Sequence, residues 1–275
     1  LGSYSKDDAA RLNDFELSAE PNYFLSRQSD SKAHSHELRI ASPGDDRFSW
    51  LVGGFYMEQD LFERDPGGIF GSGTFASLFG ITGDQVLVGP GPRTIVDLNI
   101  ENKAVFGEVN WTFAPQWTLI TGLRYDHESN DTDIDIDDFS SPADISKSFD
   151  AVLPKLGIDY QLAEGQYLGF MVQKGYRGGG VNMRAGGGHE AYDPEYTTNY
   201  ELSYRGSFFD QTLRTRANLY YTDWKDQQVS VLDRTTDFAH VFNAGSSDIK
   251  GLEVFVEKDL GEQLTLNAGG AITVL

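Results

Sequence analysis

The acidic run from Asp131 to Asp138 is the stretch of this sequence whose residue types and spacing most suggest chemistry. Carboxylates are the oxygen ligands that Ca²⁺ prefers in proteins. The run lacks the central turn glycine and the spaced glutamate of an EF-hand loop. A solvated loop or hairpin tip is therefore the simpler interpretation, and we expect neither a metal site nor a bound cofactor.

The other candidates for catalytic chemistry are weaker. Arg177-Gly178-Gly179-Gly180 has the glycines of a phosphate loop, but no Gly-Lys-Ser/Thr follows and no helix is predicted after it. These glycines are better explained as a bend where a strand ends. No serine has a Gly-x-Ser-x-Gly context, no acid–base pair stands out, and the chain has no Cys. We therefore expect no enzymatic activity.

The composition excludes further classes of function. The formal net charge is −20, from 42 acidic and 22 basic residues. Such a chain is a poor partner for nucleic acid, whose phosphates need a basic surface. No apolar run is long enough for a transmembrane helix. A transmembrane β-strand escapes that criterion because only every second residue is apolar.

Alternation of this kind begins clearly at residues 105–113. Val105, Val109 and Trp111 fall on one face of the predicted strand, while Glu108 and Asn110 fall on the other. Several further stretches repeat the pattern with charges on the second face. The predicted strands are about 10–12 residues long, which suits a tilted membrane strand better than a soluble one.

Short and long connections alternate between these strands. Short turns are predicted near residues 43–46, 115, 163, 210 and 261, and long loops at 61–100, 129–148, 177–195 and 225–243. Residues 1–35 are polar and predicted to be irregular. Aromatic residues gather near strand ends, as in the girdles of membrane barrels. We predict an all-β, antiparallel, up-and-down transmembrane β-barrel wall of about ten strands, with the long loops outside the cell.

Four stretches resemble the barrel of TonB-dependent outer-membrane receptors, and they occur in the order found in that family. They are His36-Glu37-Leu38-Arg39-Ile40-Ala41-Ser42-Pro43 with the strand from Phe48 to Tyr56, Lys174-Gly175-Tyr176-Arg177-Gly178-Gly179-Gly180-Val181-Asn182, Tyr192-Asp193-Pro194-Glu195 with Asn199-Tyr200-Glu201-Leu202, and Asn243-Ala244-Gly245 with Ile249-Lys250-Gly251-Leu252-Glu253. The resemblance covers roughly residues 36–275. It implies a 22-stranded barrel closed around an N-terminal plug.

On this reading residues 1–275 are a fragment of the barrel domain, with the plug and the final strands outside it. The resemblance implies a bacterial outer-membrane location and contact with its lipid. It also implies energy coupling by TonB through a missing N-terminal segment, and uptake of a ferric siderophore or similar large nutrient. Heme, cobalamin and oligosaccharides remain possible cargoes.

Residues of the third long loop are the candidate ligand contacts. They are Arg177, Asn182, Arg184, His189 and Tyr192. A cation at the mouth of a barrel could attract an anionic iron chelate, although loop solubility alone would also explain these residues. Two other functions stay open: a passive outer-membrane channel, and a soluble β-sheet module that binds carbohydrate.

Overall fold

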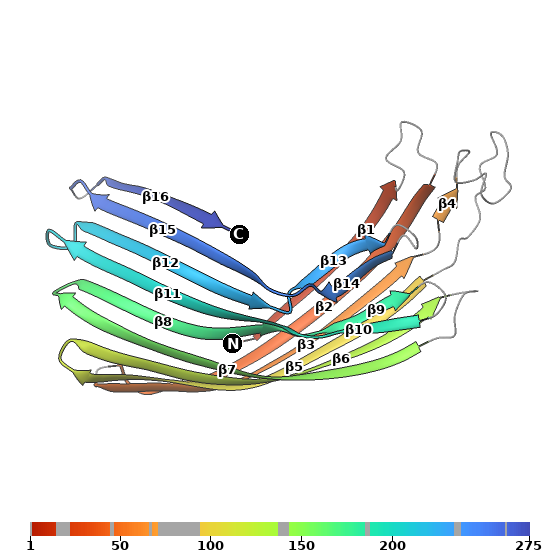
Figure 1. Ribbon diagram of the computed structural model, residues 1–275, viewed down its shortest axis with the longest axis horizontal. Coiled ribbons are helices and arrows are strands. Elements are labelled where there is room, and N and C mark those ends of the chain that lie inside the picture. Colours follow the sequence, from red (N-terminus) through yellow and green to blue (C-terminus); the bar gives the residue numbers. More distant parts are fainter. Residues whose placement is uncertain are drawn as a thin grey trace.

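The computed structural model describes residues 2–14, 23–44, 47–65, 68–70, 94–136, 143–184, 188–233, 238–261 and 263–275. These residues form sixteen β-strands and no helix (Figure 1). The strands are β1 (Gly2–Asp14), β2 (Tyr23–Ala41), β3 (Phe48–Asp65), β4 (Gly68–Phe70), β5 (Thr94–Ala114), β6 (Trp117–Ile136), β7 (Ala143–Ala163), β8 (Gln166–Arg177), β9 (Gly180–Arg184), β10 (Gly188–Tyr192), β11 (Glu195–Phe208), β12 (Leu213–Lys225), β13 (Gln228–Asp233), β14 (Phe238–Asn243), β15 (Ser247–Asp259) and β16 (Thr265–Val274).

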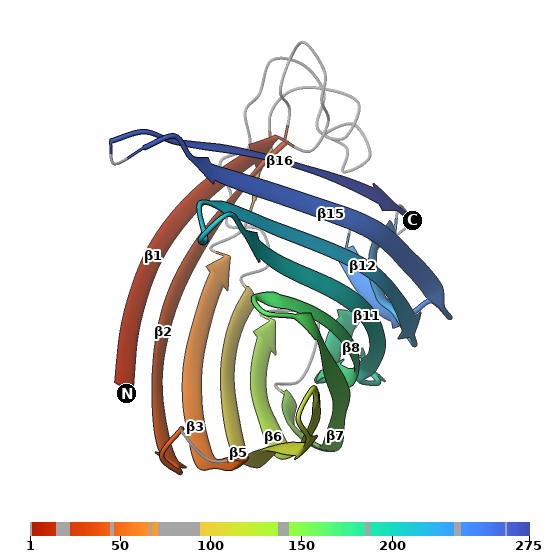
Figure 2. The same ribbon diagram turned by 90° about the vertical axis from the view of Figure 1, so that its left-hand side faces the viewer.

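One antiparallel sheet contains most of the chain. Its strands follow each other in the order β1-β2-β3-β5-β6-β7-β8-β11-β12-β15-β16, and the short β4 pairs with β2. The sheet curves into an open wall whose two edges are β1 and β16 (Figure 2). The pairs β9–β10 and β13–β14 form separate hairpins. The predicted all-β, up-and-down architecture is confirmed.

The predicted short turns lie together at one end of the wall, which we call the short-turn end. Residues 115–116, 164–165 and 209–212 connect neighbouring strands there. In the third of these turns Phe209, Asp210 and Gln211 all have positive φ, between 53° and 67°. Gly165 supplies the left-handed residue of the second turn. The opposite end carries the hairpins, and we call it the long-loop end (Figure 1).

The predicted strand length of 10–12 residues is wrong for the centre of the wall. β5, β6 and β7 have 21, 20 and 21 residues. About ten residues suffice to cross the apolar part of a bilayer in a tilted strand. The sheet therefore continues well past the membrane at the long-loop end, where both faces of a strand can be polar.

The predicted loop boundaries change for the same reason. The first predicted loop, 61–100, contains the end of β3 and the start of β5. The second, 129–148, contains the end of β6 and the start of β7. The two later loops, 177–195 and 225–243, contain the hairpins β9–β10 and β13–β14. Residues 71–93 and 137–142 lie outside the described residues.

The expectation that residues 1–35 are irregular is also wrong. β1 pairs with β2 from Gly2 opposite His36 to Asp14 opposite Phe24. Leu38 and Ile40, at the other end of β2, are exposed apolar residues. The sequence of residues 1–35 does not alternate between apolar and polar residues, so this pattern could not reveal the two strands.

The outward face of β6 shows where the membrane ends. From the short-turn end, Leu119, Leu123 and Tyr125 alternate with inward-facing residues, and Leu123 and Tyr125 are exposed. The outward residues that follow are His127, Ser129, Asp131 and Asp133. We define the apolar band of β6 as residues 117–125. In the described parts of the chain, no helix is both long enough and apolar enough to cross a membrane.

Candidate functional site

Beyond the apolar band the polarity of the wall reverses. Val96, Leu98 and Ile100 occupy the inward face of β5, opposite Ile134, Thr132 and Asn130 of β6. Ile134 and Thr132 are buried. The outward partners on β5 are polar residues such as Asp97 and Asn99. The inside of the wall thus offers an apolar surface at the long-loop end.

The two hairpins cover this surface and are tied together by asparagine side chains. Asn182 of β9 donates from Nδ2 to the Val241 carbonyl oxygen (2.5 Å) and accepts from the Val241 N–H (2.8 Å). Asn243 makes the same double contact with the backbone of Asp193, at 2.9 and 2.8 Å. Each asparagine replaces one rung of a β-ladder, so the hairpins behave as one unit.

A cavity of about 1160 Å³ lies between the hairpins and the inner wall. We call it the mouth pocket. Its wall is mainly apolar, with Glu63 beside the side chains of Met57, Leu61, Val96, Leu98, Ile100, Ile134 and Leu153. Its floor contains Asn102, Arg124, Asp126, Glu128, Asn130 and Tyr176, and its cover contains Gly178, Gly179, Gly180, Asn182, Tyr192, Gln228 and Val241.

The floor is a hydrogen-bonded chain. Asn102 of β5 lies directly opposite Glu128 of β6. Asn102 Nδ2 donates to the Tyr176 hydroxyl, which in turn lies 3.4 Å from Glu128 Oε2. Asn130 donates to the Gly179 carbonyl oxygen at 2.9 Å. Burial raises the pKa of Glu128, which lies beyond the apolar band, and burial also raises the pKa of Tyr176.

The glycines of the cover allow the close approach of the chain to the floor. A Cβ atom on Gly178 would overlap the Glu128 carboxylate, and one on Gly179 would overlap the Tyr192 carbonyl oxygen. A Cβ atom on Gly180 would overlap the Tyr192 ring. The run Gly178-Gly179-Gly180 is thus a packing requirement, in addition to the bend that the sequence predicts.

The cations at the pocket already have partners. Arg124 forms a two-point ion pair with Asp126, at 2.6 and 2.7 Å, and Asp126 is 2% exposed. Arg177 Nε lies 2.9 Å from the Glu195 carboxylate and donates to Gln228 Oε1 at 3.0 Å. Glu195 also accepts the backbone N–H of Gln228 at 2.6 Å. These pairs hold the cover in place and neutralise both guanidinium groups.

The structure brings three of the five predicted ligand residues to the mouth pocket. Arg177, Asn182 and Tyr192 line it, although Arg177 and Asn182 are engaged in the contacts given above. Burial raises the pKa of Tyr192. Arg184 and His189 belong to the β9–β10 hairpin, where their backbones pair with Gly188 and Met183. Their side chains lie outside the described part of the structure.

Sequence reasoning missed the residues of the floor. Asn102 is buried, and its hydrogen bond to Tyr176 spans 74 residues of sequence. Asn130 of β6 falls inside the predicted loop 129–148, and Glu128 lies one residue before it. One signal could have found them. Polar residues continue the inward face of β6 directly after Arg124 and Asp126, which keeps the strand period of two.

The acidic run lies away from the pocket. Asp131 and Asp133 are exposed on the outward face of β6, whereas Thr132 and Ile134 between them are buried. Asp137 and Asp138 lie outside the described residues. Within the described ranges, no cluster of three or more His, Asp or Glu residues is arranged to hold a metal ion.

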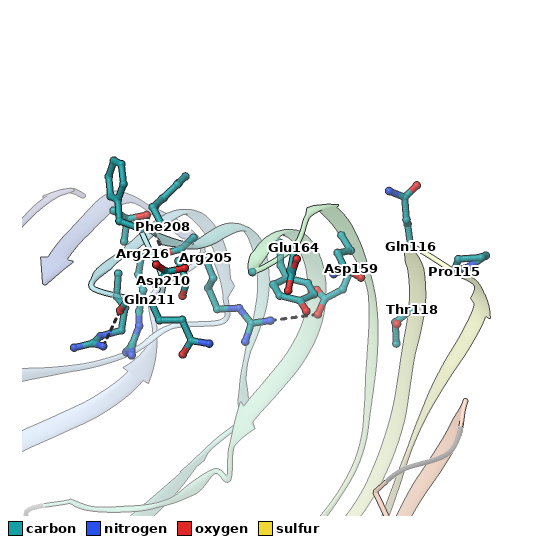
Figure 3. A pocket seen from close by; sticks show the side chains of 18 of the residues that line it. Pro115, Gln116, Thr118, Asp159, Glu164, Arg205, Phe208, Asp210, Gln211 and Arg216 are labelled. Carbon is teal, nitrogen blue, oxygen red and sulfur yellow. Dashed lines mark hydrogen bonds and ion pairs between the residues drawn. The ribbon is translucent and has the colours of Figure 1, made fainter. Parts of the chain in front are cut away.

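A second cavity, of about 890 Å³, lies at the short-turn end. Arg205 reaches Asp159 at 3.4 Å across its floor, as Figure 3 shows. Arg214 pairs with Glu257 at 2.6 Å and with Asp259 at 2.9 Å. The first pair joins β11 to β7 across β8, and the second joins the neighbouring strands β12 and β15. This cavity offers no apolar wall comparable to that of the mouth pocket.

Comparison with protein families gives one match over nearly the whole chain. The family model described as TonB dependent receptor-like, beta-barrel matches residues 2–273. A curated relative, the probable TonB-dependent siderophore receptor PiuA of Acinetobacter baumannii, is 22% identical over 186 residues. That alignment covers 64% of this chain and 24% of PiuA, so the chain spans about a quarter of the length of this relative.

Solved structures show the same fold. The ferric yersiniabactin uptake receptor FyuA from Yersinia pestis is 18% identical, with a TM-score of 0.77 over 99% of this chain and 39% of FyuA. The copper transporter OprC is 16% identical, with a TM-score of 0.67 over 99% of this chain and 43% of OprC. P. aeruginosa FpvA, solved with a heterologous pyoverdine and iron, has a TM-score of 0.65 at 12% identity, over 99% of this chain and 37% of FpvA.

Proposed function

The chain belongs to the TonB-dependent receptor β-barrel family, and on that basis we propose that it forms the barrel wall of a receptor for ferric siderophore uptake. Members of this family are transport receptors of the Gram-negative outer membrane. PiuA is named for siderophores and FyuA for ferric yersiniabactin. The observation that carries the proposal for this chain is the mouth pocket, because about 1160 Å³ accommodates a large chelate.

The two surfaces of the wall support this assignment. The outward residues Leu119, Leu123 and Tyr125 of β6 form a lipid-facing band. A soluble carbohydrate-binding module would expose these residues to water, so the band disfavours that alternative. The mouth pocket lies beyond the band at the long-loop end, which in this proposal faces the outside of the cell.

We assign the ligand contacts to the mouth pocket. Arg177, Asn182 and Tyr192 line it, and Arg184 and His189 belong to the hairpin that covers it. We propose the five as ligand contacts or supports, with Asn182 acting through the position of the hairpins. No chemical step on the ligand belongs to this proposal, because the wall captures and passes on cargo and performs no catalysis.

Transport in this proposal requires the TonB energy-coupling protein, which would contact a segment outside residues 1–275. A passive outer-membrane channel is the alternative. Uptake of ⁵⁵Fe-labelled siderophore separates the two when the full-length protein is expressed in a Gram-negative host that lacks its own siderophore receptors. The proposal expects uptake that stops when TonB is deleted. Uptake that continues without TonB would favour the passive channel.

A further inference from the structure

The floor of the mouth pocket contains two buried acceptors without donors. Asn102 and Asn130 are 7% and 6% exposed, and their Oδ1 atoms have no hydrogen-bond partner. Their Nδ2 groups are used, by Tyr176 and by the Gly179 carbonyl oxygen. Buried polar atoms are rarely left without a partner in a folded protein. Two free acceptors lining one cavity therefore point to a ligand that brings donors.

The Glu128 carboxylate adds a negative charge at the same place. It lies opposite Asn102 in the β5–β6 ladder and two residues from Asn130 on the same inward face. Its hydrogen-bonding neighbours are the neutral groups of Asn102, Asn130 and Tyr176. Among the described residues, no Lys, Arg or His lies within ion-pair distance of it. The floor thus presents acceptors and one uncompensated carboxylate.

Both arginines among the residues that line the mouth pocket are already paired. Arg124 is held by Asp126, and Arg177 is held by Glu195.

The apolar wall then limits the rest of the ligand. Val96, Leu98 and Ile100 form a continuous surface on the inward face of β5, directly beyond Asn102. A ligand with a cationic group on the floor would place an apolar body along this surface. The pocket therefore favours an amphipathic molecule with a cationic group at one end and an apolar body.

We propose that the mouth pocket binds ferric complexes that carry no net negative charge and that present a protonated nitrogen to Asn102, Glu128 and Asn130. This inference rests on the proposed function and specifies its substrate class. It differs from the expectation that a cation at the mouth attracts an anionic chelate, because Arg177 is paired with Glu195.

A matched pair of probes tests the inference on the full-length receptor. The cationic probe is the ferric complex of desferrioxamine B, a linear trihydroxamate with one free ammonium group. The neutral probe is the same complex with that amine acetylated, and ferric citrate serves as an anionic probe. Binding is measured by fluorescence quenching in detergent. We expect the cationic probe to bind about tenfold tighter than the acetylated probe, as for one charge-assisted hydrogen bond.

Two substitutions should move this ratio in opposite directions. Glu128→Gln removes the charge and should bring the ratio close to one, whereas Asn102→Asp adds a charge and should raise it. A misfolded variant would weaken both probes alike and leave the ratio unchanged. Glu101→Gln is the control. Glu101 precedes Asn102 in the sequence, but its side chain faces outward and pairs with Lys103.

The outcomes separate the inference from the proposed function. Tighter binding of ferric citrate overturns the inference while uptake through TonB still stands. A ratio that Glu128→Gln leaves unchanged, with the affinity for the acetylated probe retained, does the same. Saturable binding of none of the three ferric probes overturns the inference, whereas the proposed function is tested by the dependence of uptake on TonB. A higher affinity for the ammonium probe that depends on Glu128 supports both.

Discussion

The side-chain amide of Asn182 pairs with both backbone groups of Val241, as a neighbouring strand would. The distances are 2.5 Å from Nδ2 to the carbonyl oxygen and 2.8 Å from the Val241 nitrogen to Oδ1. Asn182 is 8% exposed, so both bonds are sheltered from water. The hairpins β9–β10 and β13–β14 are therefore joined by a side chain at a place where the main sheet has already ended.

Replacement of Asn182 by leucine should separate the two hairpins. The substitution keeps the size of the side chain but leaves two partly buried backbone groups of Val241 without these partners. The expected cost is about 1 kcal/mol each. We expect faster hydrogen–deuterium exchange across β14, with little change in β5 and β6. Asn99→Leu is the control, because Asn99 bonds Asp60 on the outward face. Equal exchange in the two variants would contradict the coupling.

A methyl group at Gly179 should distort the cover of the pocket. Gly179→Ala places a Cβ atom against the Tyr192 carbonyl oxygen, and backbone cannot move aside as a flexible side chain can. The expected cost is about 1–3 kcal/mol, as for other overpacked sites, with a loss of ligand affinity of about tenfold. Gly270→Ala is the matched control, since nothing lies within 4 Å of its added Cβ. Thermal unfolding and ligand titration measure the two effects.

The position of the membrane can be tested along one face of one strand. Leu123 and Asp131 both face outward on β6, inside and beyond the apolar band. Leu123→Arg should cost about 2–4 kcal/mol in lipid, whereas the same charge beyond the band should cost about 0–1 kcal/mol. Unfolding in liposomes measures both. A similar cost for Leu123→Arg and Asp131→Arg would show that the band is misplaced.

The raised pKa of Glu128 predicts a pH-dependent effect on stability. The fold favours the protonated carboxyl, so its stabilising contribution is full below the unfolded value near 4.5 and is lost as the pH rises through the folded pKa. Glu128→Gln should therefore raise the melting temperature at neutral pH, and this difference should disappear at a pH of about 4.

Glu101 gives the opposite sign and serves as the comparison. A hydrogen bond from Lys103 lowers the pKa of Glu101, so its contribution is present above the unfolded value and is lost as the pH falls. Glu101→Gln should lower the melting temperature at neutral pH. The test measures the melting temperatures of both variants between a pH of about 4 and neutral pH. A change of the same sign in both variants would contradict the environments assigned to Glu128 and Glu101.

The sequence predicts well the part of the wall that the bilayer shapes. Leu123 and Tyr125 alternate with Arg124 and Asp126 because lipid selects apolar residues on one face. Beyond Tyr125 water replaces lipid, and outward residues such as Asp131 are polar. The alternation that reveals a strand is lost there. The sequence therefore predicts irregular structure for β1 and most of β2, and loops for the far ends of β5, β6 and β7.

The site could not be predicted because its parts come from distant strands. Arg177, Asn182 and Tyr192 were named from one loop, and all three line the pocket. Asn102 and Glu128 form the floor with Tyr176, and only the register of the sheet and the inward turn of the chain after β8 bring them together. The partners that neutralise a cation, such as Glu195 for Arg177, are equally invisible in a pattern of spacing.

The unusual length of β5 and β6 has a consequence for the entropy of ligand capture. Because the floor of the pocket is part of a continuous ladder, Asn102, Glu128 and Asn130 are held in place before any ligand arrives. Binding loses affinity when it must immobilise side chains and loops, and a preorganised surface avoids much of that loss. The hairpins alone can adapt to cargo, so variants of this receptor should change ligand more readily in the cover than in the floor.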